Sequence, residues 1–491
     1  MSGVDGEPRM LIDGQLVEAR SGRRFENINP ATEAVIGEAA DGGHDDFDAA
    51  IGAARRAFDE TDWSTDRALR KRCLEQLHRA ISSERDALRA ELIAEVGAPV
   101  GIMGGLQLDG ALDHEFPWPV EFIDEFGWER ELPVNETPLG RSWRRVLKEP
   151  VGVVAAIVPW NFPFEVAVSK LVPALATGNT VILKAAPQTP WNATRLGRLV
   201  AEHTDFPAGV FQVLTTSDNE VAEDLVSDPR VDMVSFTGST AVGRRIMALA
   251  APSLKRLFLE LGGKSAHVVL DDADLERALA ASAIAACRHG GQSCATLTRV
   301  LLPRSRYDEG VGVIEARFGE VRYGDPLERD VIQGPQISAR QRDRILSYID
   351  GGVSEGARLV LGGGRPAGLP VGYYVEPTLF ADVENSMRIA QEEIFGPVLV
   401  VIPYDDEDDA VRIANDSPYG LSSAVSSGSE ARAVRVARRL RAGTASINGG
   451  VWLAPDSPFG GYKASGIGRQ NGLEGFEQYT ETKTIAGPLA A

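Results

Sequence analysis

The stretch Val151-Gly152-Val153-Val154-Ala155-Ala156-Ile157-Val158 decides the fold of this chain. An apolar run of this length predicts a strand that is buried on both faces of a sheet. Strand and helix patterns alternate after it, with strands expected at 180–184, 210–214 and 231–236 and helices at 164–176, 190–203, 219–226 and 239–250. Short connections between such elements are typical of a parallel, doubly wound α/β sheet with right-handed crossovers.

A second α/β pattern follows Glu260-Leu261-Gly262-Gly263, beginning with a strand at 265–270 and a helix at 274–287. More than one domain is expected, because 491 residues are too many for a single hydrophobic core. Ligand sites are expected beyond the carboxyl ends of the parallel strands and at the seam between the domains.

The segment before residue 141 predicts mainly helices, at 45–58, at 67–96 and in part of 106–126, where Pro117 and Pro119 are expected to break the helix. A strand-turn-strand is expected within 10–17. Two distant segments, 141–149 and 478–485, have alternating patterns that favour extended strands. They could pair into an arm, or both could be edge strands of one sheet.

Composition and charge exclude several classes of protein. The net charge of −19 argues against nucleic-acid binding, because phosphate recognition needs a basic surface. The N-terminus has no basic segment followed by an apolar one, and no apolar run could span a bilayer, so no signal peptide and no membrane segment are expected. Three cysteines and six scattered histidines form neither a disulfide framework nor a metal-site spacing, which favours a reducing cytoplasm and no metal.

Gly290-Gly291-Gln292-Ser293-Cys294 is the candidate for a catalytic nucleophile. Its glycines let the backbone approach a ligand closely, and the Cys294 N–H could stabilise an oxyanion beside its own thiolate. The alternative is a small apolar side chain in the core, which is the commoner fate of a free cysteine.

A candidate anion site lies at Phe236-Thr237-Gly238-Ser239-Thr240-Ala241-Val242-Gly243, where a strand end, a glycine turn and a helix start follow one another. The free N–H groups of the helix could bind a phosphate, and Ser239 could cap the helix and donate to a phosphate oxygen. The spacing matches neither the phosphate loop of NTPases nor the usual dinucleotide fingerprint. A capped helix that packs through a glycine is the alternative.

Three further polar residues could take part in chemistry. Glu260 ends an apolar strand, where desolvation would raise the pKa of its carboxyl group and suit a general base. Asn161, in a loop bracketed by prolines, could donate to an oxyanion, and Glu393 could accept from ribose hydroxyls. A salt bridge, an Asx-turn and a solvated turn are the respective alternatives.

Six motifs occur in one order along the chain. They are Pro159-Trp160-Asn161-Phe162-Pro163, Phe236-Thr237-Gly238-Ser239-Thr240, Leu259-Glu260-Leu261-Gly262-Gly263-Lys264, Gly291-Gln292-Ser293-Cys294, Glu393-Ile394-Phe395-Gly396-Pro397 and Pro458-Phe459-Gly460-Gly461-Tyr462-Lys463 with Ser465-Gly466. With this set the chain strongly resembles the aldehyde dehydrogenase superfamily from about Met10 to Ile485. The resemblance implies an NAD(P)-dependent enzyme of the hydrolytic, non-CoA-acylating type.

The resemblance also implies the architecture. A Rossmann-like doubly wound cofactor domain would comprise 1–127 and 151–260, and a second α/β domain, 261–462, would carry Cys294. A small β arm, 128–150 and 463–491, would join chains into a homodimer or homotetramer.

In such an enzyme Cys294 would add to the aldehyde carbon to give a thiohemiacetal, and hydride transfer to the nicotinamide would leave a thioester. Water activated by Glu260 would hydrolyse the thioester to the carboxylic acid. Asn161 and the Cys294 N–H would form the oxyanion hole, and Lys170 would lie near the base for proton relay.

Contacts to NAD would come from Lys184 at the adenosine ribose, Ser239 at the pyrophosphate, Glu393 at the nicotinamide ribose and Phe395 near the nicotinamide. The whole implied set is Ile157, Pro159, Trp160, Lys184, Gly238, Ser239, Gly243, Leu261, Glu393 and Phe395. The implied substrate tunnel is Phe164, Ser293, Ala295, Trp452 and Phe459, whose aromatic share favours an apolar or aromatic aldehyde.

The chain departs from the family pattern twice. Many NAD-preferring members have Glu where this chain has Pro187, so NADP use is less well excluded. The family often has Glu after the segment Gly466-Ile467-Gly468-Arg469, where this chain has Gln470, and a proton-relay role is not expected there.

Three other functions compete with this one. A CoA-acylating dehydrogenase would not need Glu260 to activate water. A cysteine esterase would need a histidine beside the thiol, and only His289 is close in sequence. A non-catalytic binding protein would not need Cys294, Glu260 and Asn161 together.

Overall fold

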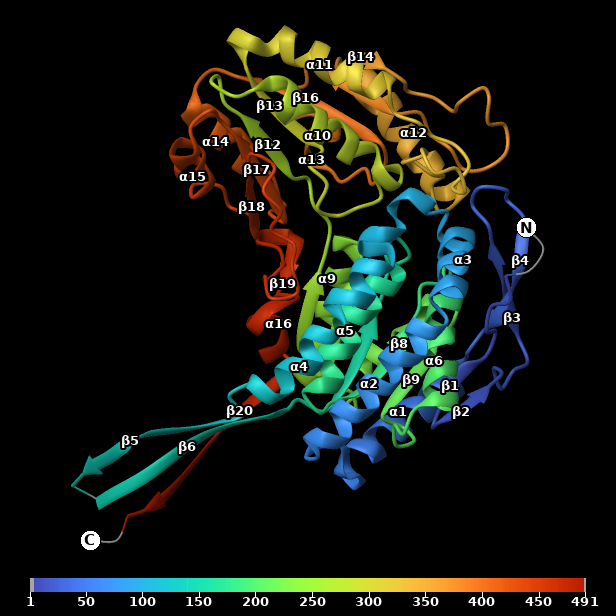
Figure 1. Cartoon of the computed structure of the whole chain (residues 1–491), viewed down its shortest axis with the longest axis vertical. Coiled ribbons are helices and arrows are strands. Elements are labelled where there is room, and N and C mark those ends of the chain that lie inside the picture. The colour runs from blue at the N-terminus through green and yellow to red at the C-terminus, as the bar shows by residue number, and fades with distance from the viewer. Residues whose placement is uncertain (1–3, 139, 490–491) are drawn as a thin grey trace.

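The computed structural model describes residues 4–138 and 140–489, which form two α/β bodies and a projecting arm (Figure 1). The first body is built on an eight-stranded sheet in the order β19-β11-β10-β7-β8-β9-β1-β2. The second body is built on a seven-stranded sheet in the order β14-β15-β16-β13-β12-β17-β18. The predicted α/β fold class with a doubly wound sheet is therefore confirmed.

The centre of the first sheet is parallel, as the alternating pattern predicts. Its parallel strands are β7 (Val153–Ile157), β8 (Thr180–Lys184), β9 (Phe211–Leu214), β10 (Met233–Thr237) and β11 (Arg256–Glu260). Three antiparallel strands flank them, namely β1 (Met10–Ile12), β2 (Gln15–Val17) and β19 (Gly466–Ile467). The connecting and covering helices are α1 (His44–Glu60), α5 (Pro163–Ala176), α6 (Trp191–His203), α7 (Asn219–Ala222), α8 (Asp224–Ser227), α9 (Thr240–Ala250) and α16 (Gly472–Glu477).

The second sheet continues the same architecture. Its strands are β12 (Ala266–Val269), β13 (Arg299–Pro303), β14 (Arg358–Leu361), β15 (Thr378–Ala381), β16 (Val398–Tyr404), β17 (Ser422–Ser426) and β18 (Thr444–Ile447), of which only β14 pairs antiparallel. Its helices are α10 (Leu275–Cys287), α11 (Tyr307–Gly319), α12 (Ala339–Ser354), α13 (Arg388–Gln391), α14 (Glu407–Asn415) and α15 (Glu430–Ala437).

Alternate residues of the central strands enter different hydrophobic clusters, which explains their continuous apolar character. On β7, Val154 and Ala156 pack with helices α5 and α6 on one face of the sheet. Val153 and Ala155 pack with α1 and α9 on the other face. A strand that is covered on both sides has no polar face, so the apolar run predicts its position correctly.

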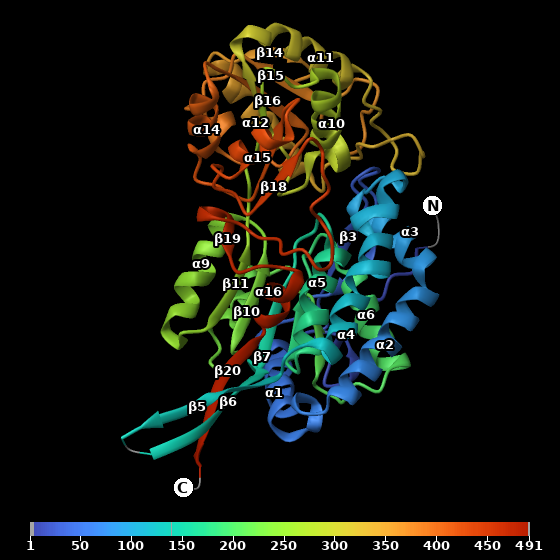
Figure 2. The ribbon, with the colours of Figure 1, turned by 60° about the vertical axis from the view of Figure 1, so that its left-hand side comes forward.

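The arm is a three-stranded antiparallel sheet of β5 (Glu129–Thr137), β6 (Gly140–Pro150) and β20 (Thr480–Pro488). The register between β6 and β20 runs from Ser142 opposite Pro488 to Pro150 opposite Thr480. The predicted pairing of the two distant segments is confirmed, whereas β5 was not predicted. Figures 1 and 2 show the arm extending away from both bodies, with the C-terminus at its tip. Within 463–491, β19 pairs with β11 of the first body and only β20 enters the arm.

Two helix predictions were wrong. The segment 67–96 is two helices, α2 (Arg67–Ser83) and α3 (Arg85–Val96), because the chain leaves helical geometry at Glu84, whose carboxylate binds Arg195 and Arg198 of α6. Pro117 and Pro119 do not break a helix but begin one, α4 (Pro117–Glu125), since the missing N–H costs nothing in a first turn. Two π-helical turns, η3 (Met103–Gln107) and η4 (Ala111–Glu115), precede it.

Two smaller differences concern short elements. The predicted helix at 219–226 is divided into α7 and α8. The hairpin of β3 (Arg24–Ile28) and β4 (Val35–Ala40) was not predicted. No helix within residues 4–138 and 140–489 is both long enough and apolar enough to cross a membrane.

Candidate active site

The nucleophile candidate lies in a loop with an unusual backbone. His289, Gly290 and Gly291 all have positive φ, at 54°, 65° and 70°, just before the segment that leads to Cys294 and β13. A Cβ atom on Gly291 would lie within 2.1 Å of the Gly396 carbonyl oxygen, so no larger residue fits. The loop therefore needs glycine both for its dihedral angles and for its close approach to the backbone at Gly396.

Asn161 fixes this loop against the first body. Its Nδ2 donates to the carbonyl oxygen of Gln292 at 2.9 Å, and its own carbonyl accepts from Gln107 Nε2 at 2.8 Å. His289 Nε2 lies 2.9 Å from the same carbonyl and must be the donor, because a carbonyl oxygen only accepts. Burial lowers the pKa of His289 to about 4. His289 is thus a neutral bracing residue and not a base for the thiol.

Cys294 differs from the other two cysteines in its surroundings. Cys73 and Cys287 are buried in hydrophobic clusters, whereas Cys294 is partly exposed. Burial raises the pKa of the Cys294 thiol above its ordinary value, and the charges of Glu260 and Glu393 raise it further. The thiol therefore needs a base to become a nucleophile.

Glu260 is the candidate for such a base. It ends β11, is 2% exposed, and neither of its carboxylate oxygens has a hydrogen-bond partner in the described chain. Burial raises its pKa to about 8, and the opposing charges of Lys170 and Arg469 only partly offset this. The sequence-based expectation of a desolvated, raised carboxyl group at this strand end is confirmed.

Lys170 lies on α5 behind Glu260. The ammonium nitrogen is fully buried, has no hydrogen-bond partner among the described residues and lies 4.3 Å from the centre of the Phe258 ring. Burial lowers the pKa of Lys170 to about 7, against the charges of Glu260 and Glu165. A lysine with this pKa can both accept and release a proton at neutral pH.

The carboxyl edge of the first sheet offers a place for a dinucleotide. Ser239 accepts from the Val242 N–H at 3.3 Å and caps α9, and Gly238 donates to the Glu260 carbonyl at 3.0 Å. A Cβ on Gly243 would lie 2.7 Å from Leu261, so this glycine permits the helix to approach the strand end. Lys184 ends β8 on the same edge, and burial lowers its pKa to about 8.

Residues of the second body face this edge. Glu393 Oε1 accepts from the Gly263 N–H at 3.0 Å, and burial raises the pKa of Glu393 to about 7. Phe395, with a φ of 60°, meets the ring of Trp160 edge-on at 5.4 Å between centroids. The predicted cofactor residues at the strand ends and in the loop before β16 therefore lie around one seam.

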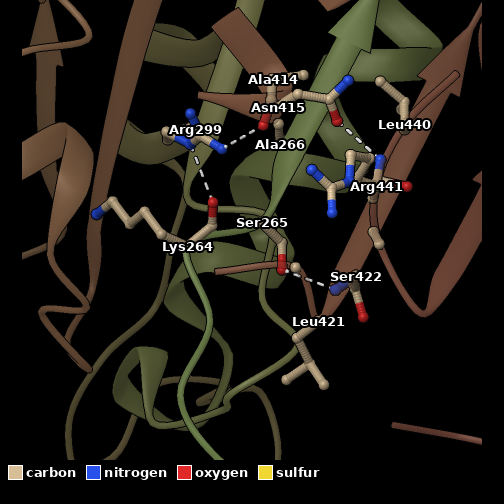
Figure 3. A pocket seen from close by; sticks show the side chains of 13 residues that line it. Lys264, Ser265, Ala266, Arg299, Ala414, Asn415, Leu421, Ser422, Leu440 and Arg441 are labelled. Carbon is tan, nitrogen blue, oxygen red and sulfur yellow. Dashed lines mark hydrogen bonds between the residues drawn. The ribbon is translucent and has the colours of Figure 1, made fainter. Parts of the chain in front are cut away.

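The segment that links the two sheets is braced beside Lys264. Figure 3 shows Arg299 donating to the carbonyl oxygens of Lys264 and Ala414, at 2.9 Å each, while Ser265 accepts from the Ser422 N–H. The cavity between these residues has a volume of about 20 Å³, which suits a water molecule and no organic ligand. Close packing also explains the glycines that follow Glu260. A Cβ on Gly263 would lie 2.5 Å from the Cys294 carbonyl oxygen, so only glycine fits there.

The predicted tunnel residues fall into two groups. Trp452 and Phe459 stack at 5.2 Å with an interplanar angle of 12°, and Ser293 and Ala295 are partly exposed beside Cys294. Phe164 has no exposed surface and lies in the core of the first body.

Comparison with known proteins identifies the family. The model of the aldehyde dehydrogenase family matches residues 16–485. The chain belongs to the aldehyde dehydrogenase family. This confirms the resemblance seen in the six ordered motifs.

Members of this family with similar sequences and structures span the whole chain. A 3-succinoylsemialdehyde-pyridine dehydrogenase from Pseudomonas sp. is 43% identical over 479 residues, covering 97% of this chain and 98% of the relative. The crystal structure of a Mycobacterium tuberculosis aldehyde dehydrogenase complexed with NAD+ superposes with a TM-score of 0.93 at 41% identity, covering 99% of each chain. A mutant of aldehyde dehydrogenase C from Pseudomonas syringae, complexed with NAD+ and octanal, gives 0.92 at 37%, covering 98% of this chain and 96% of that one.

Sequence reasoning missed two carboxyl groups near the site of this aldehyde dehydrogenase. Glu165 in the first turn of α5 and Glu115 at the end of η4 are buried side by side. A signal existed for Glu165, because it is an acidic residue in the otherwise apolar stretch Pro163-Phe164-Glu165-Val166-Ala167-Val168. No comparable signal existed for Glu115.

Gly460→Ala is expected to reduce the aldehyde dehydrogenase rate without unfolding the chain. The new Cβ would lie 2.6 Å from the Gly468 carbonyl oxygen and 2.9 Å from Glu260 Oε1, so the Glu260 carboxylate must move. A displacement of this kind costs on the order of 10²-fold in kcat. NADH formation measures it, with Gly312→Ala as control, since a Cβ there meets nothing within 4 Å. A kcat equal to that of the control would contradict the assigned role of Glu260.

Proposed function

We propose that this enzyme oxidises an apolar or aromatic aldehyde to the carboxylic acid with NAD+, through a thioester on Cys294 that is hydrolysed by water activated by Glu260. Membership of the family and its NAD+-bound relatives support aldehyde oxidation with NAD+. One observation carries the mechanism. The partly exposed Cys294 thiol lies near the buried Glu260 carboxylate, whose oxygens have no hydrogen-bond partner in the described chain and whose charge raises the pKa of the thiol.

The first half of the reaction uses Cys294, Glu260 and Asn161. Glu260 accepts the thiol proton, and the Cys294 sulfur forms a bond to the aldehyde carbon. The negative oxygen that results accepts hydrogen bonds from the Cys294 N–H and from Asn161. The Asn161 amide has two N–H groups and donates one to Gln292, so the other is free for the substrate. NAD+, when bound, supplies the hydride acceptor, which no side chain can be.

The second half returns the enzyme to its starting state. Glu260 accepts a proton from water as the water oxygen bonds to the thioester carbon. The carbon–sulfur bond then breaks, Cys294 leaves as the thiolate, and the thiolate takes up one proton to become the thiol again. The same carboxyl group serves both halves, so it must lose its proton to solvent between them.

The chain's own residues fit a dinucleotide. Gly238, Ser239 and the N-terminus of α9 suit the pyrophosphate, and a side chain at Gly243 would push the helix off Leu261. Lys184 at the end of β8 suits the adenosine ribose, while Glu393 and Phe395 suit the nicotinamide half. Ile157, Pro159 and Trp160 would line the same edge after β7.

The substrate tunnel is assigned to Trp452, Phe459, Ser293 and Ala295, whereas Phe164 is fully buried in the core of the first body. A stacked aromatic pair favours an apolar or aromatic aldehyde.

The proposed function is tested by following NADH absorbance with octanal, benzaldehyde, a pyridine semialdehyde and betaine aldehyde. Turnover without CoA supports the proposal; turnover only with CoA, or ester cleavage without NADH, would replace it by the acylating dehydrogenase or the esterase.

Pro187→Glu is expected to sharpen the preference for NAD+. Pro187 follows Lys184-Ala185-Ala186 at the end of β8 and offers no acceptor to ribose hydroxyls. A carboxylate there would accept from both hydroxyls and repel a 2′-phosphate, lowering kcat/KM for NADP+ relative to NAD+ by at least about tenfold, or about 1.4 kcal/mol. Pro187→Gln is the matched neutral control. An unchanged ratio would show that residue 187 does not face the ribose.

The three-stranded arm is proposed to join chains into a homodimer or homotetramer. Most residues of β5 and β20 are exposed, and an isolated arm of this kind gains little stability by itself. The proposed division keeps 1–127 with 151–260 as the cofactor domain and 261–462 as the catalytic domain. The particle mass in solution, by light scattering, tests the assembly, and a monomer would refute it.

A further inference from the structure

Two buried carboxyl groups meet outside the set of residues assigned to catalysis. Glu115 and Glu165 are 6% and 8% exposed, and burial together with the charge of Glu165 raises the pKa of Glu115. Two neighbouring buried carboxylates repel each other when both are ionised, which favours a proton on one of them. Glu165 Oε1 accepts from Gln470 Nε2 at 2.9 Å, whereas Glu115 Oε2 has no partner in the described chain.

The pair is connected inward to Glu260 through Lys170. Lys170 lies on the same helix as Glu165, and its charge acts on both Glu165 and Glu260. The Lys170 ammonium and both Glu260 oxygens are buried without hydrogen-bond partners among the described residues. Buried polar atoms without protein partners are positions where ordered water bridges groups.

The pair is connected outward through a small cavity. It has a volume of about 10 Å³, enough for about one water, and is lined by Glu115, Ser169, Trp118, Asn471 and others. Asn471 also has a buried side-chain nitrogen without a partner, and the Trp118 and Asn471 side chains are partly exposed. Glu115 thus lies between the interior and a water-sized cavity that approaches the surface.

Residue 470 offers no group that could carry a proton away from Lys170. Glutamine neither accepts nor releases a proton at neutral pH, so Gln470 can only orient Glu165. Besides Glu260, the carboxyl group whose charge acts on Lys170 is that of Glu165, and the charge of Glu165 acts in turn on Glu115.

We propose that the Glu165–Glu115 pair conducts to solvent the proton that Glu260 takes from the hydrolytic water, with Lys170 between them. The proposal rests on the proposed function. One O–H bond of water breaks, its oxygen joins the thioester carbon, and its proton protonates Glu260. Glu260 passes a proton to neutral Lys170, Lys170 protonates Glu165, and Glu115 releases a proton to water. Glu260 loses two protons in each turnover, one from the thiol and one from water, and the Cys294 thiolate takes one up. The net release is therefore one proton per turnover, and each group regains its starting charge.

The acidities are matched along this path. Burial raises the pKa of Glu165 to about 7 and lowers that of Lys170 to about 7, while that of Glu260 is raised to about 8. Burial also raises the pKa of Glu115. Proton transfer between groups of similar pKa has little cost in either direction.

Stopped-flow NADH measurements on Glu165→Gln and Glu115→Gln test the pair. Glu165 and Glu115 act as positioning and relay residues and touch no substrate, so the first equivalent of NADH, which forms before hydrolysis, is expected at the wild-type rate. The steady-state rate is expected to fall by roughly tenfold or more, since regeneration of Glu260 becomes limiting. Glu121→Gln on α4, an exposed site nearby, is the matched control and is expected to behave as wild type.

Two measurements distinguish a proton-relay role of Glu165 from a purely structural one. Imidazole buffer is expected to restore the steady-state rate of Glu165→Gln, and the double variant Glu165→Gln with Gln470→Glu is expected to restore it by returning a carboxyl group beside Lys170. A steady-state rate equal to wild type, or an equal loss in the first turnover with no rescue, would overturn the proposal. A wild type that forms no NADH with any aldehyde would instead remove the proposed function itself.

Discussion

Cys294→Ala is expected to abolish aldehyde-dependent NADH formation, with kcat falling on the order of 10⁴-fold or more. The sulfur forms the bond to the aldehyde carbon, and alanine has no atom that can replace it. The loss should extend to ester cleavage, because any acyl group would be carried by the same sulfur. NADH absorbance and release of 4-nitrophenol from its acetate measure the two activities side by side.

The other two cysteines provide the control for this substitution. Cys73 lies in the core of the first body, on α2, and burial raises the pKa of its thiol to about 11. Cys73→Ala is therefore expected to keep full activity per folded molecule and to lower stability by about 1 kcal/mol. Thermal unfolding of Cys294→Ala should match wild type, because this side chain is partly exposed. Persistent NADH formation by Cys294→Ala would exclude the thioester mechanism.

Much of the fold could be predicted because buried parallel strands have a simple signature. The runs at β7, β8 and β9 are apolar on both faces, since both faces are covered by helices. The pairing of β6 with β20 was expected only as one of two alternatives, because similar patterns do not specify partners far apart in sequence.

Errors arose where a tertiary contact overrides local preference. Nothing in the helical periodicity of 67–96 indicates the break at Glu84, whose carboxylate pairs with arginines of α6. The prolines before Val120 were expected to end a helix, and whether a proline ends or begins one depends on where its first turn lies.

The residues of the candidate site could be predicted where their properties are local to the sequence, and not where they depend on distant contacts. Glu260 could be identified as a raised carboxyl group because it ends an apolar strand, which is a local property. Glu115 could not, because its partner Glu165 is distant in sequence and π-helical turns bring the two together. The bracing of Gln292 by Asn161 and His289 is likewise a contact between the two bodies that no motif spacing encodes.

Glu260→Gln is expected to slow thioester hydrolysis more than thioester formation, because a thiol can lose its proton to solvent far more readily than water can. Glutamine keeps the shape of the side chain but accepts no proton, so thioester hydrolysis should slow by roughly 10²- to 10⁴-fold. An acyl-enzyme that forms but does not hydrolyse should be detectable by intact-mass spectrometry after rapid mixing with aldehyde and NAD+. Glu474→Gln, on the exposed face of α16, is the matched control. Unimpaired steady-state turnover would show that another group activates the water.

The pH dependence follows from the acidity of the same carboxyl group. Glu260 acts as a base only when ionised, and burial raises its pKa to about 8, so wild-type kcat should fall about tenfold per pH unit below that value. The effect on stability has the opposite direction. A carboxyl group whose pKa is raised on folding stabilises the folded state at low pH, and this contribution is lost as pH rises through about 8. Glu260→Gln should therefore lose the acid limb of activity and unfold at a higher temperature than wild type above pH 8, a combination that removal of a merely structural group would not produce.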